Sequence, residues 1–212
     1  RAKNKISNRQ PVKVSPFVET HPNKAKWLWK CRSERSVIML SFRNTLREND
    51  PEVIAQIASS TGFFDDRDVQ LNADIARHLL RNKDCEHRFL FAEYNGKTVA
   101  YACFEELPDA KAGTYELYWL STLNEYRGLG IGRQLVEYLL AHLKSLGAER
   151  LYVKTDSTPQ YEPTRRFYEK CGFKLGAVLP EYYDTGDDCC IYCLNMKADE
   201  LGITERQYAA AE

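Results

Sequence analysis

The most informative segment of this 212-residue chain reads Arg127-Gly128-Leu129-Gly130-Ile131-Gly132-Arg133. It directly follows a predicted strand, residues 114–123, and opens a predicted helix that ends near residue 145. Glycine at every second position lets the backbone approach a ligand closely with its N–H groups turned outward. The start of the helix adds a partial positive charge, and the two arginines add full charges. The segment therefore predicts a cradle for an anion such as a phosphate or pyrophosphate.

Two common phosphate-binding motifs fail to match this segment. A dinucleotide-binding fingerprint that starts at Gly128 needs a glycine at its sixth position, which is Arg133 here. A nucleotide-binding P-loop needs Gly-Lys-Ser/Thr, whereas Gly132 is followed by Arg133-Gln134. Two interpretations remain, a cradle for another phosphate ligand and a glycine-rich loop that only turns the chain.

The residues before this segment predict two helices and then a hairpin. Asp50 is expected to cap the first helix, and Asp65 or Asp66 begins the second. Apolar residues then alternate over residues 88–105, on both sides of Asn95-Gly96. This dipeptide is the strongest short-range hairpin signal, so two antiparallel strands are expected here.

A second motif follows downstream and reads Thr164-Arg165-Arg166-Phe167-Tyr168-Glu169-Lys170-Cys171-Gly172-Phe173. Residues 163–171 predict a short helix that carries an aromatic pair and that Gly172 ends. Further strands are predicted at residues 150–155, 173–179 and 189–195.

Taken together, the two motifs resemble those of the GNAT superfamily of acyl-CoA-dependent N-acyltransferases. The family signature Gln/Arg-x-x-Gly-x-Gly/Ala is matched by Arg127, Gly130 and Gly132. The motifs and their strands span about residues 87–195. The resemblance implies an α/β (α+β) fold with a GNAT-like mixed, mostly antiparallel central sheet of six to seven strands and helices on both faces. The expected acetyltransferase domain spans residues 36–197.

The resemblance also implies acetyl-CoA as a co-substrate. Backbone amides of the glycine-rich segment would hold its pyrophosphate, and residues 114–123 would splay from residues 151–155 to pair with the pantetheine arm. An N–H group near Leu120 or Ser121 would polarise the thioester carbonyl. The predicted cofactor-binding residues are Leu120, Ser121, Thr122, Arg127, Gly128, Leu129, Gly130, Ile131, Gly132 and Arg133.

Tyr168 matches the tyrosine that family members often use as general acid toward the departing thiolate. The reference pKa of tyrosine, roughly 10, is close to that of an alkyl thiol, so the proton can move without a large penalty. The other interpretation is that Tyr168 only packs in its helix. The amine is expected to attack directly, without an acyl-enzyme, and Cys103 and Cys171 are predicted to be structural.

Glu116 is the predicted general base, because many family members use a carboxylate on this strand. Alternation along the strand places Glu116 on one face with Tyr118, Leu120 and Thr122. The alternatives are a purely structural Glu116, with Glu105, Glu106 or water as the base. No metal is expected, since acyl transfer from a thioester needs only positioning and charge stabilisation.

The acceptor is less well determined by the sequence. In the family, several loops surround the entrance for the acceptor. The corresponding loops of this chain carry acidic and aromatic residues: Asp156, Tyr161, Tyr182, Tyr183, Asp187 and Asp188. Such groups favour a small cationic amine or an amino-acid-like acceptor, and an ordinary solvated rim is the alternative. Phe63 and Phe64 either line an entrance or pack in the core. The predicted activity is N-acetyl transfer to a primary amine; the alternatives are acetylation of a protein lysine or N-terminus and a non-catalytic acyl-CoA-binding module.

The composition excludes several other classes of protein. Thirty basic residues balance thirty acidic ones, so no global field favours nucleic acid or an anionic membrane. The longest apolar runs, Val99–Phe104 and Cys189–Leu194, are six residues each, whereas a membrane-spanning helix needs roughly twenty. The seven cysteines show no disulfide framework. Cys190-x-x-Cys193 is a lone pair without the second pair that a zinc site needs, which favours buried thiols in a reducing cytoplasm over metal or redox chemistry.

The two ends of the chain differ from its middle. Residues 1–35 hold ten basic and two acidic residues and are predicted to be an extension, a linker, or a docking segment for something acidic. Residues 198–212 form a polar tail. Because the sequence begins at Arg1 and not at a methionine, an additional domain before residue 1 is one possibility. A homodimer is a separate possibility that the sequence does not decide.

Overall fold

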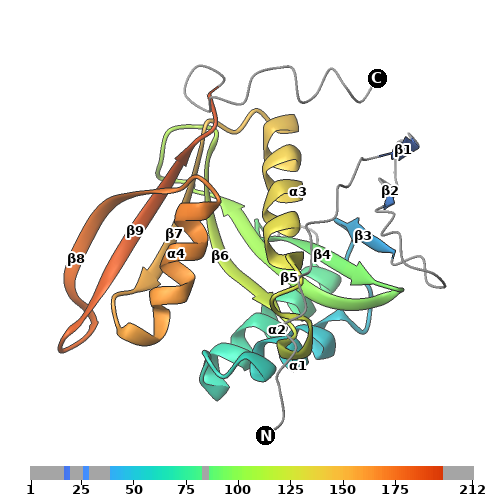
Figure 1. Ribbon diagram of the computed structural model, residues 1–212, viewed down its shortest axis with the longest axis horizontal. Helices are drawn as coiled ribbons and strands as arrows, with labels where there is room; N and C mark the ends of the chain where they lie inside the picture. The colour runs from blue at the N-terminus through green and yellow to red at the C-terminus, as the bar shows by residue number, and fades with distance from the viewer. Residues whose placement is uncertain (1–16, 20–25, 29–38, 83–85, 198–212) are drawn as a thin grey trace, which may run out of the picture.

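A computed structural model describes residues 17–19, 26–28, 39–82 and 86–197. In this part of the chain a seven-stranded sheet has the order β3-β4-β5-β6-β7-β9-β8 (Figure 1). Its strands are β3 (Leu40–Arg43), β4 (Arg88–Tyr94), β5 (Lys97–Glu106), β6 (Thr114–Thr122), β7 (Arg150–Asp156), β8 (Lys174–Asp184) and β9 (Asp187–Asn195). All neighbours pair antiparallel except β6 and β7, which are parallel. The predicted fold class is confirmed.

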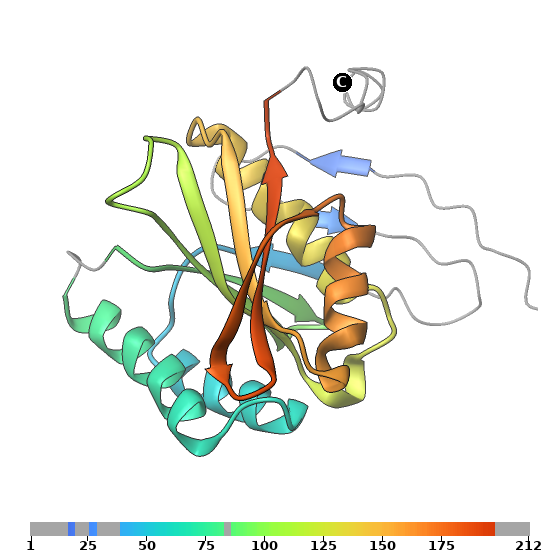
Figure 2. The same ribbon diagram turned by 90° about the vertical axis from the view of Figure 1, so that its left-hand side faces the viewer.

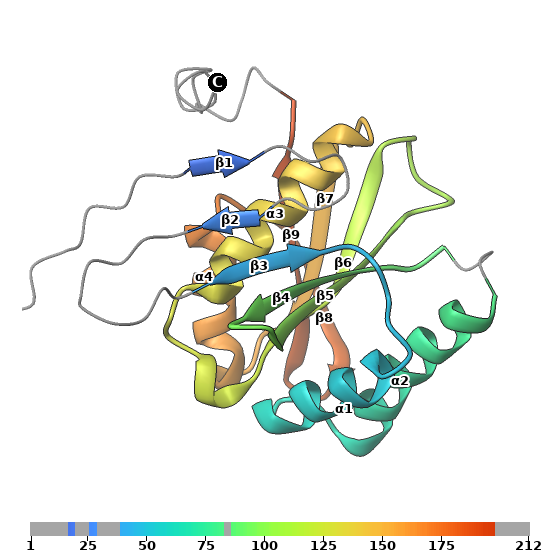
Figure 3. The same ribbon diagram turned by 90° about the vertical axis from the view of Figure 1, so that its right-hand side faces the viewer.

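Helices cover both faces of the sheet. They are α1 (Asp50–Thr61), α2 (Asp66–Arg81), α3 (Ile131–Ser145) and α4 (Glu162–Lys170), with short 3₁₀ turns η1 (Asn124–Tyr126) and η2 (Pro159–Tyr161). Tyr101 of β5 donates a hydrogen bond to Asn72 of α2 at 2.9 Å, whereas Phe104, on the other face of β5, packs against His142 of α3. Figures 2 and 3 show α1 and α2 on one side of the sheet and α3 with α4 on the other.

Local signals in the sequence explain most element boundaries. Asn95 and Gly96 both have positive φ, 49° and 82°, as the tight hairpin turn between β4 and β5 requires. Asp65 caps α2 by accepting the N–H of Asp68 at 2.8 Å.

The predicted cap of α1 is wrong, because its N-cap is Asn49 and not Asp50. The Asp50 carboxylate binds the guanidinium of Arg43 at 2.6 Å and accepts the N–H of Arg47 at 2.6 Å. Asp50 is buried, and its carboxylate therefore links α1 to Arg43 on β3 and does not cap the helix.

The strands β6 and β7 separate part-way along their length. They pair from Thr114 opposite Arg150 to Leu117 opposite Val153, and the pairing ends there. The remaining residues of both strands diverge, as the family resemblance implied. This opening positions the site described below.

The ends of the chain are described only in part. Residues Phe17–Glu19 (β1) and Lys26–Leu28 (β2) pair antiparallel. The rest of residues 1–35, the tail at 198–212, Cys31 and Cys85 lie outside the described residues, so the domain boundaries stay predictions. Within the described part, no helix is long and apolar enough to cross a membrane.

Candidate active site

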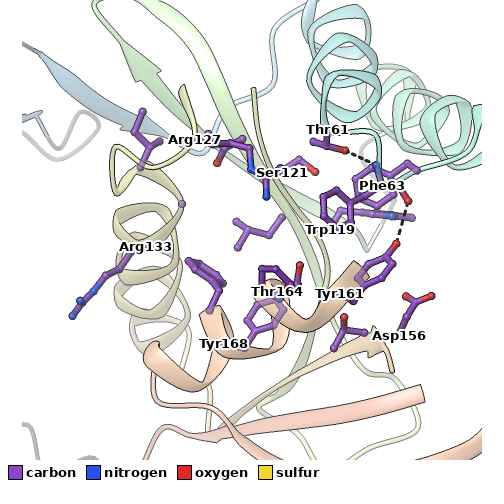
Figure 4. A pocket seen from close by; sticks show the side chains of 18 of the residues that line it. Thr61, Phe63, Trp119, Ser121, Arg127, Arg133, Asp156, Tyr161, Thr164 and Tyr168 are labelled. Atoms are coloured by element: carbon purple, nitrogen blue, oxygen red, sulfur yellow. Dashed lines mark hydrogen bonds between the residues drawn. The ribbon is translucent and has the colours of Figure 1, made fainter. Parts of the chain in front are cut away.

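A cavity of about 770 Å³ lies where β6 and β7 diverge. Its walls come from the end of β6, the loop that enters α3, the end of β7, α4 and the α1–α2 loop (Figure 4). Nine of the ten predicted cofactor-binding residues line it: Leu120, Ser121, Thr122, Arg127, Gly128, Gly130, Ile131, Gly132 and Arg133. Leu129 does not line the cavity, and 56% of its surface is exposed.

One end of the cavity is made of backbone. Gly128 and Gly130 adopt left-handed conformations, with φ of 77° and 78°, and Gly130 is the N-cap of α3. The first turn of an α-helix has N–H groups without intrahelical acceptors, and here that turn borders the cavity. This arrangement can bind an anion. We call this the cradle end.

Two arginines border the cradle end but are held differently. The Arg127 guanidinium lies 5.4 Å from the ring centroid of Phe63, a cation–π contact with the α1–α2 loop. Arg133 pairs with Glu137 one turn along α3, at 3.1 Å, and both side chains are largely exposed. Figure 4 shows the Arg133 side chain pointing away from the cavity, so the guanidinium of Arg127 is the positive charge that lies nearer to its interior.

A β-bulge changes which residues of β6 face the side of the sheet that α1 and α2 cover. Trp119 lies opposite Cys103, and Leu117 lies opposite Phe104, so Tyr118 is one extra residue in β6. The alternation shifts by one at this point. Glu116 therefore shares its face with Trp119 and Ser121. The predicted grouping of Glu116 with Leu120 and Thr122 is wrong, because unbroken alternation was assumed.

Glu116 lies apart from the cavity. Its carboxylate is 4% exposed and contacts the ammonium group of Lys154 at 3.1 Å, and Glu116 is not among the lining residues. Its role as general base stays a prediction, and this placement adds no support to it.

The two alternative glutamates are engaged in hydrogen bonds. Glu105 accepts the hydroxyl of Tyr118 at 2.6 Å and contacts His87 at 3.0 Å. Glu106 accepts the N–H of Gly113 at 2.7 Å. Neither carboxylate is among the residues that line the cavity.

Tyr168 lies between the two ends of the cavity. It is 6% exposed, and its ring packs edge-on against Phe167 and Phe173, at 5.4 and 5.5 Å. Burial raises the pKa of Tyr168 above its ordinary value, so the hydroxyl keeps its proton. The role of Tyr168 as general acid stays a prediction: its phenol keeps the proton that it would donate, but the raised pKa also makes it a weaker acid than an ordinary tyrosine.

The two cysteines predicted to be structural do not line the cavity. Cys103 is fully buried in the core. Burial raises the pKa of Cys171 to about 11, which keeps this side chain a thiol at neutral pH.

The opposite end of the cavity is made of aromatic and acidic side chains, and we call it the acceptor end. It comprises Phe63, Phe64, Asp68, Trp119, Asp156, Tyr161 and Tyr183. Tyr161 donates a hydrogen bond to the carbonyl of Phe63 at 3.1 Å, and the two rings meet edge-on at 5.2 Å. Phe63 therefore borders the cavity; the sequence had left open whether it lines an entrance or packs in the core.

The acceptor end holds a carboxyl group with altered acidity. Burial, reinforced by a hydrogen bond and the negative charge from Asp187, raises the pKa of Asp156 to about 6. The same surroundings raise the pKa of Tyr161 to about 12, with burial as the main cause. Tyr182, Asp187 and Asp188, which the sequence placed near the entrance, do not line the cavity.

Sequence reasoning missed several lining residues, among them Trp119, Lys154, Thr155 and Thr164. Thr155 is 4% exposed, and its hydroxyl has no hydrogen-bond partner among the described residues. Thr164 begins the second motif but was not recognised as a site residue, and no local motif marks the other three. Those three reach the cavity because β7 diverges from β6 and because the bulge redirects Trp119.

Residues 52–173 match the sequence model of the Acetyltransferase (GNAT) family. The chain belongs to the GNAT family. It is therefore an acyltransferase of the EC 2.3.1 type, and the resemblance of its two motifs is confirmed.

Relatives of this GNAT protein include enzymes with different acceptors in their names. The 5-NmdU N-acetyltransferase of Pseudomonas phage PaMx11 is 28% identical over 139 residues, which cover 65% of this chain and 89% of the relative. The N-alpha-acetyltransferase of Sulfurisphaera tokodaii is 31% identical over 117 residues, covering 50% and 68%.

Solved structures agree with the fold. A crystal structure assigned to the GNAT family, from Desulfovibrio desulfuricans, has a TM-score of 0.71 at 32% identity and covers 74% of this chain and 99% of its own. An aminoglycoside 6'-N-acetyltransferase complexed with coenzyme A has a TM-score of 0.58 at 20% identity, covering 74% and 97%.

Proposed function

We propose that this GNAT enzyme transfers the acetyl group of acetyl-CoA to the primary amine of a small cationic acceptor. The observation that carries the proposal is that one cavity joins an anion-binding cradle to an acidic, aromatic end. The diphosphate of the co-substrate suits the first end, and an ammonium group suits the second.

The residues of the cradle end fit acetyl-CoA. A side-chain atom added at Gly128 would meet nothing within 4 Å, so the backbone there faces open space that a diphosphate can fill. Beyond Leu117 the backbone of β6 no longer pairs with β7 and is free to pair with the pantetheine arm. When bound, acetyl-CoA supplies an acetyl carbon activated as a thioester.

The chain's own residues then have distinct tasks. The N–H groups near Leu120 and Ser121 polarise the thioester carbonyl, and Tyr168 gives a proton to the departing sulfur. No cysteine among the described residues lines the cavity, which supports direct attack by the acceptor amine without an acyl-enzyme.

A second candidate acceptor is the N-terminus or a lysine of a protein. The 31% identity to an N-alpha-acetyltransferase favours it. A protein acceptor needs an open groove, whereas a small amine needs side walls like those of Phe63, Tyr161 and Tyr183 at the acceptor end. The walls favour the small amine.

The test is the release of free thiol from acetyl-CoA by the complete chain. The acceptors are a panel of diamines, amino-acid amides, aminosugars and peptides that carry a free N-terminus or a lysine. We expect turnover with small cationic amines and little with peptides. Turnover confined to peptides would support the protein acceptor. Tight binding of acetyl-CoA without any turnover would identify a binding module.

A further inference from the structure

We propose that Asp156, and not Glu116, is the base that removes the proton from the acceptor ammonium group, with Asp187 as the residue that tunes it. This inference rests on the proposed function. It names the catalytic base at the same site, and its first test is independent of turnover.

Asp156 lies at the opening between the strands. It is the last residue of β7, three residues beyond Val153, where the pairing with β6 ends. By alternation it points to the same side of the sheet as Glu116 and Trp119, the side covered by α1 and α2. Figure 4 shows Asp156 beside Tyr161, at the far end of the cavity from Arg127 and Arg133.

The two candidate carboxylates differ in access. Asp156 lines the cavity, and no lysine or arginine among the described residues forms an ion pair with it. The nearby guanidinium of Arg165 instead donates to main-chain carbonyls, that of Asp156 at 2.5 Å and that of Thr158 at 3.0 Å. Glu116 is outside the cavity and neutralised by Lys154. Of these two carboxylates, only Asp156 lines the cavity and can contact an ammonium group there directly.

Asp187 is held in place as the partner of Asp156. One oxygen of its carboxylate accepts the N–H of Ser157 at 3.1 Å, and Ser157 in turn accepts the N–H of Asp188 at 2.8 Å. These contacts hold the Asp187 carboxylate next to the loop that follows Asp156. A hydrogen bond and the negative charge from Asp187 add to burial in raising the pKa of Asp156.

The other charged or titratable groups around Asp156 are Asp68 of α2, Lys154 of β7, Tyr161 of η2, Arg165 of α4 and Tyr183 of β8. Burial is the largest cause that raises the pKa of Asp156 to about 6, followed by Asp187, and the negative charge of Asp68 adds to them. A base with this pKa is largely ionised at pH 7 and binds a proton more readily than an ordinary aspartate.

The proton balance of the transfer is then as follows. The acceptor nitrogen forms a bond to the acetyl carbon while the bond from that carbon to sulfur breaks. The nitrogen gives up two protons in all. One passes to Asp156 and from there to water. Tyr168 protonates the departing sulfur, and the second proton of the nitrogen passes through water to the Tyr168 phenolate, which restores the phenol.

The first test uses the ligand-free protein labelled with ¹³C at the aspartate carboxyl carbons. We expect one carboxyl resonance that titrates near pH 6 and is absent from Asp156→Asn. In Asp187→Asn it should titrate at lower pH, toward the ordinary value of 3.8, because its charged neighbour is gone. Asp66→Asn removes an exposed carboxylate of α2 that does not line the cavity, and it should change nothing. Ordinary titration of every aspartate would overturn the assignment of the pair.

The second test uses the best cationic amine from the acceptor panel. Asp156→Asn should lower kcat/KM at pH 7 by roughly 10²-fold or more, while acetyl-CoA affinity stays unchanged. Asp187→Asn should move the acidic limb of the pH profile of kcat/KM to lower pH. With hydroxylamine, which is largely uncharged at pH 7, the loss in Asp156→Asn should be much smaller.

The outcomes separate the two proposals. A wild-type protein that transfers acetyl to no amine contradicts the proposed function, whatever the NMR titration shows. An active wild type in which Asp156→Asn keeps a normal pH profile, or in which Glu116→Gln loses more activity, contradicts the base assignment alone.

Discussion

The two ends of the cavity are built from different parts of the polypeptide. The cradle end consists mainly of backbone N–H groups from one continuous segment, Gly128 to Arg133. The acceptor end consists of side chains from elements far apart in the sequence, such as Phe63, Trp119 and Asp156. A co-substrate shared by a whole family can be bound by a local backbone motif, whereas the acceptor depends on how distant elements pack together.

The largest effect is expected from a change to the backbone of the cradle end. Gly130→Val places a side chain on a residue with φ of 78° and fills the space proposed for the diphosphate. Acetyl-CoA binding, measured by calorimetry, should weaken by about 10²-fold or more, because the added side chain occupies the space that the diphosphate needs.

Gly186→Val is the matched control for this change. Gly186 has the same φ of 78° and open space around it, but it lies in the β8–β9 turn outside the cavity. It should reduce stability without weakening the binding of acetyl-CoA. Equal binding by both variants would show that the diphosphate does not lie at the cradle.

The next largest effect concerns the centre of the cavity. Tyr168→Phe removes the proposed proton donor and keeps the ring between Phe167 and Phe173. Turnover should fall by roughly 10²-fold with little change in acetyl-CoA affinity. Tyr138→Phe, on α3 and outside the cavity, should keep normal turnover. A normal rate in Tyr168→Phe would leave this tyrosine a packing role only.

A smaller effect is expected for the ion pair next to the opening. Lys154→Met leaves the buried carboxylate of Glu116 without its cation. The free energy of unfolding in urea should fall by about 1–3 kcal/mol. Adding Glu116→Gln to this variant should restore part of the loss, because the buried charge is then removed. A further loss in the double variant would mean that Glu116 has another partner.

The smallest effect is expected from a side chain of the cradle end. Arg133 is largely exposed and already paired with Glu137, so Arg133→Gln should weaken acetyl-CoA binding only about two- to fivefold. The difference should shrink further in high salt. A loss as large as that of Gly130→Val would contradict the view that backbone groups dominate this end.

The hairpin and the cradle could be predicted because local signals specify them, whereas the mixed sheet of six to seven strands was implied by the family resemblance. Asn95-Gly96 favours a tight turn, and the glycines before α3 permit the left-handed backbone found there. Gly130 is therefore recognisable without knowledge of its neighbours in space.

The remaining features depend on tertiary contacts that no local pattern records. The carboxylate of Asp50 forms a buried ion pair with Arg43 of β3, so this residue does not cap α1 although its position in the sequence suggested a cap. The altered acidity of Asp156 comes from Asp187, 31 positions away in the sequence, and from burial that only the folded chain creates.

The extra residue at Tyr118 lets the length of β6 change by one residue without an exchange of its faces. Leu117 already lies opposite Phe104 and Trp119 opposite Cys103, so deleting Tyr118 would restore regular pleating and keep this register. Ser121 would stay on the side of Glu116, and Leu120 on the side of α3. The deletion would remove only the Tyr118 side chain, which lines the cavity and donates a hydrogen bond to Glu105 at 2.6 Å. A one-residue deletion at the bulge should therefore act on this wall of the cavity like the loss of a single side chain.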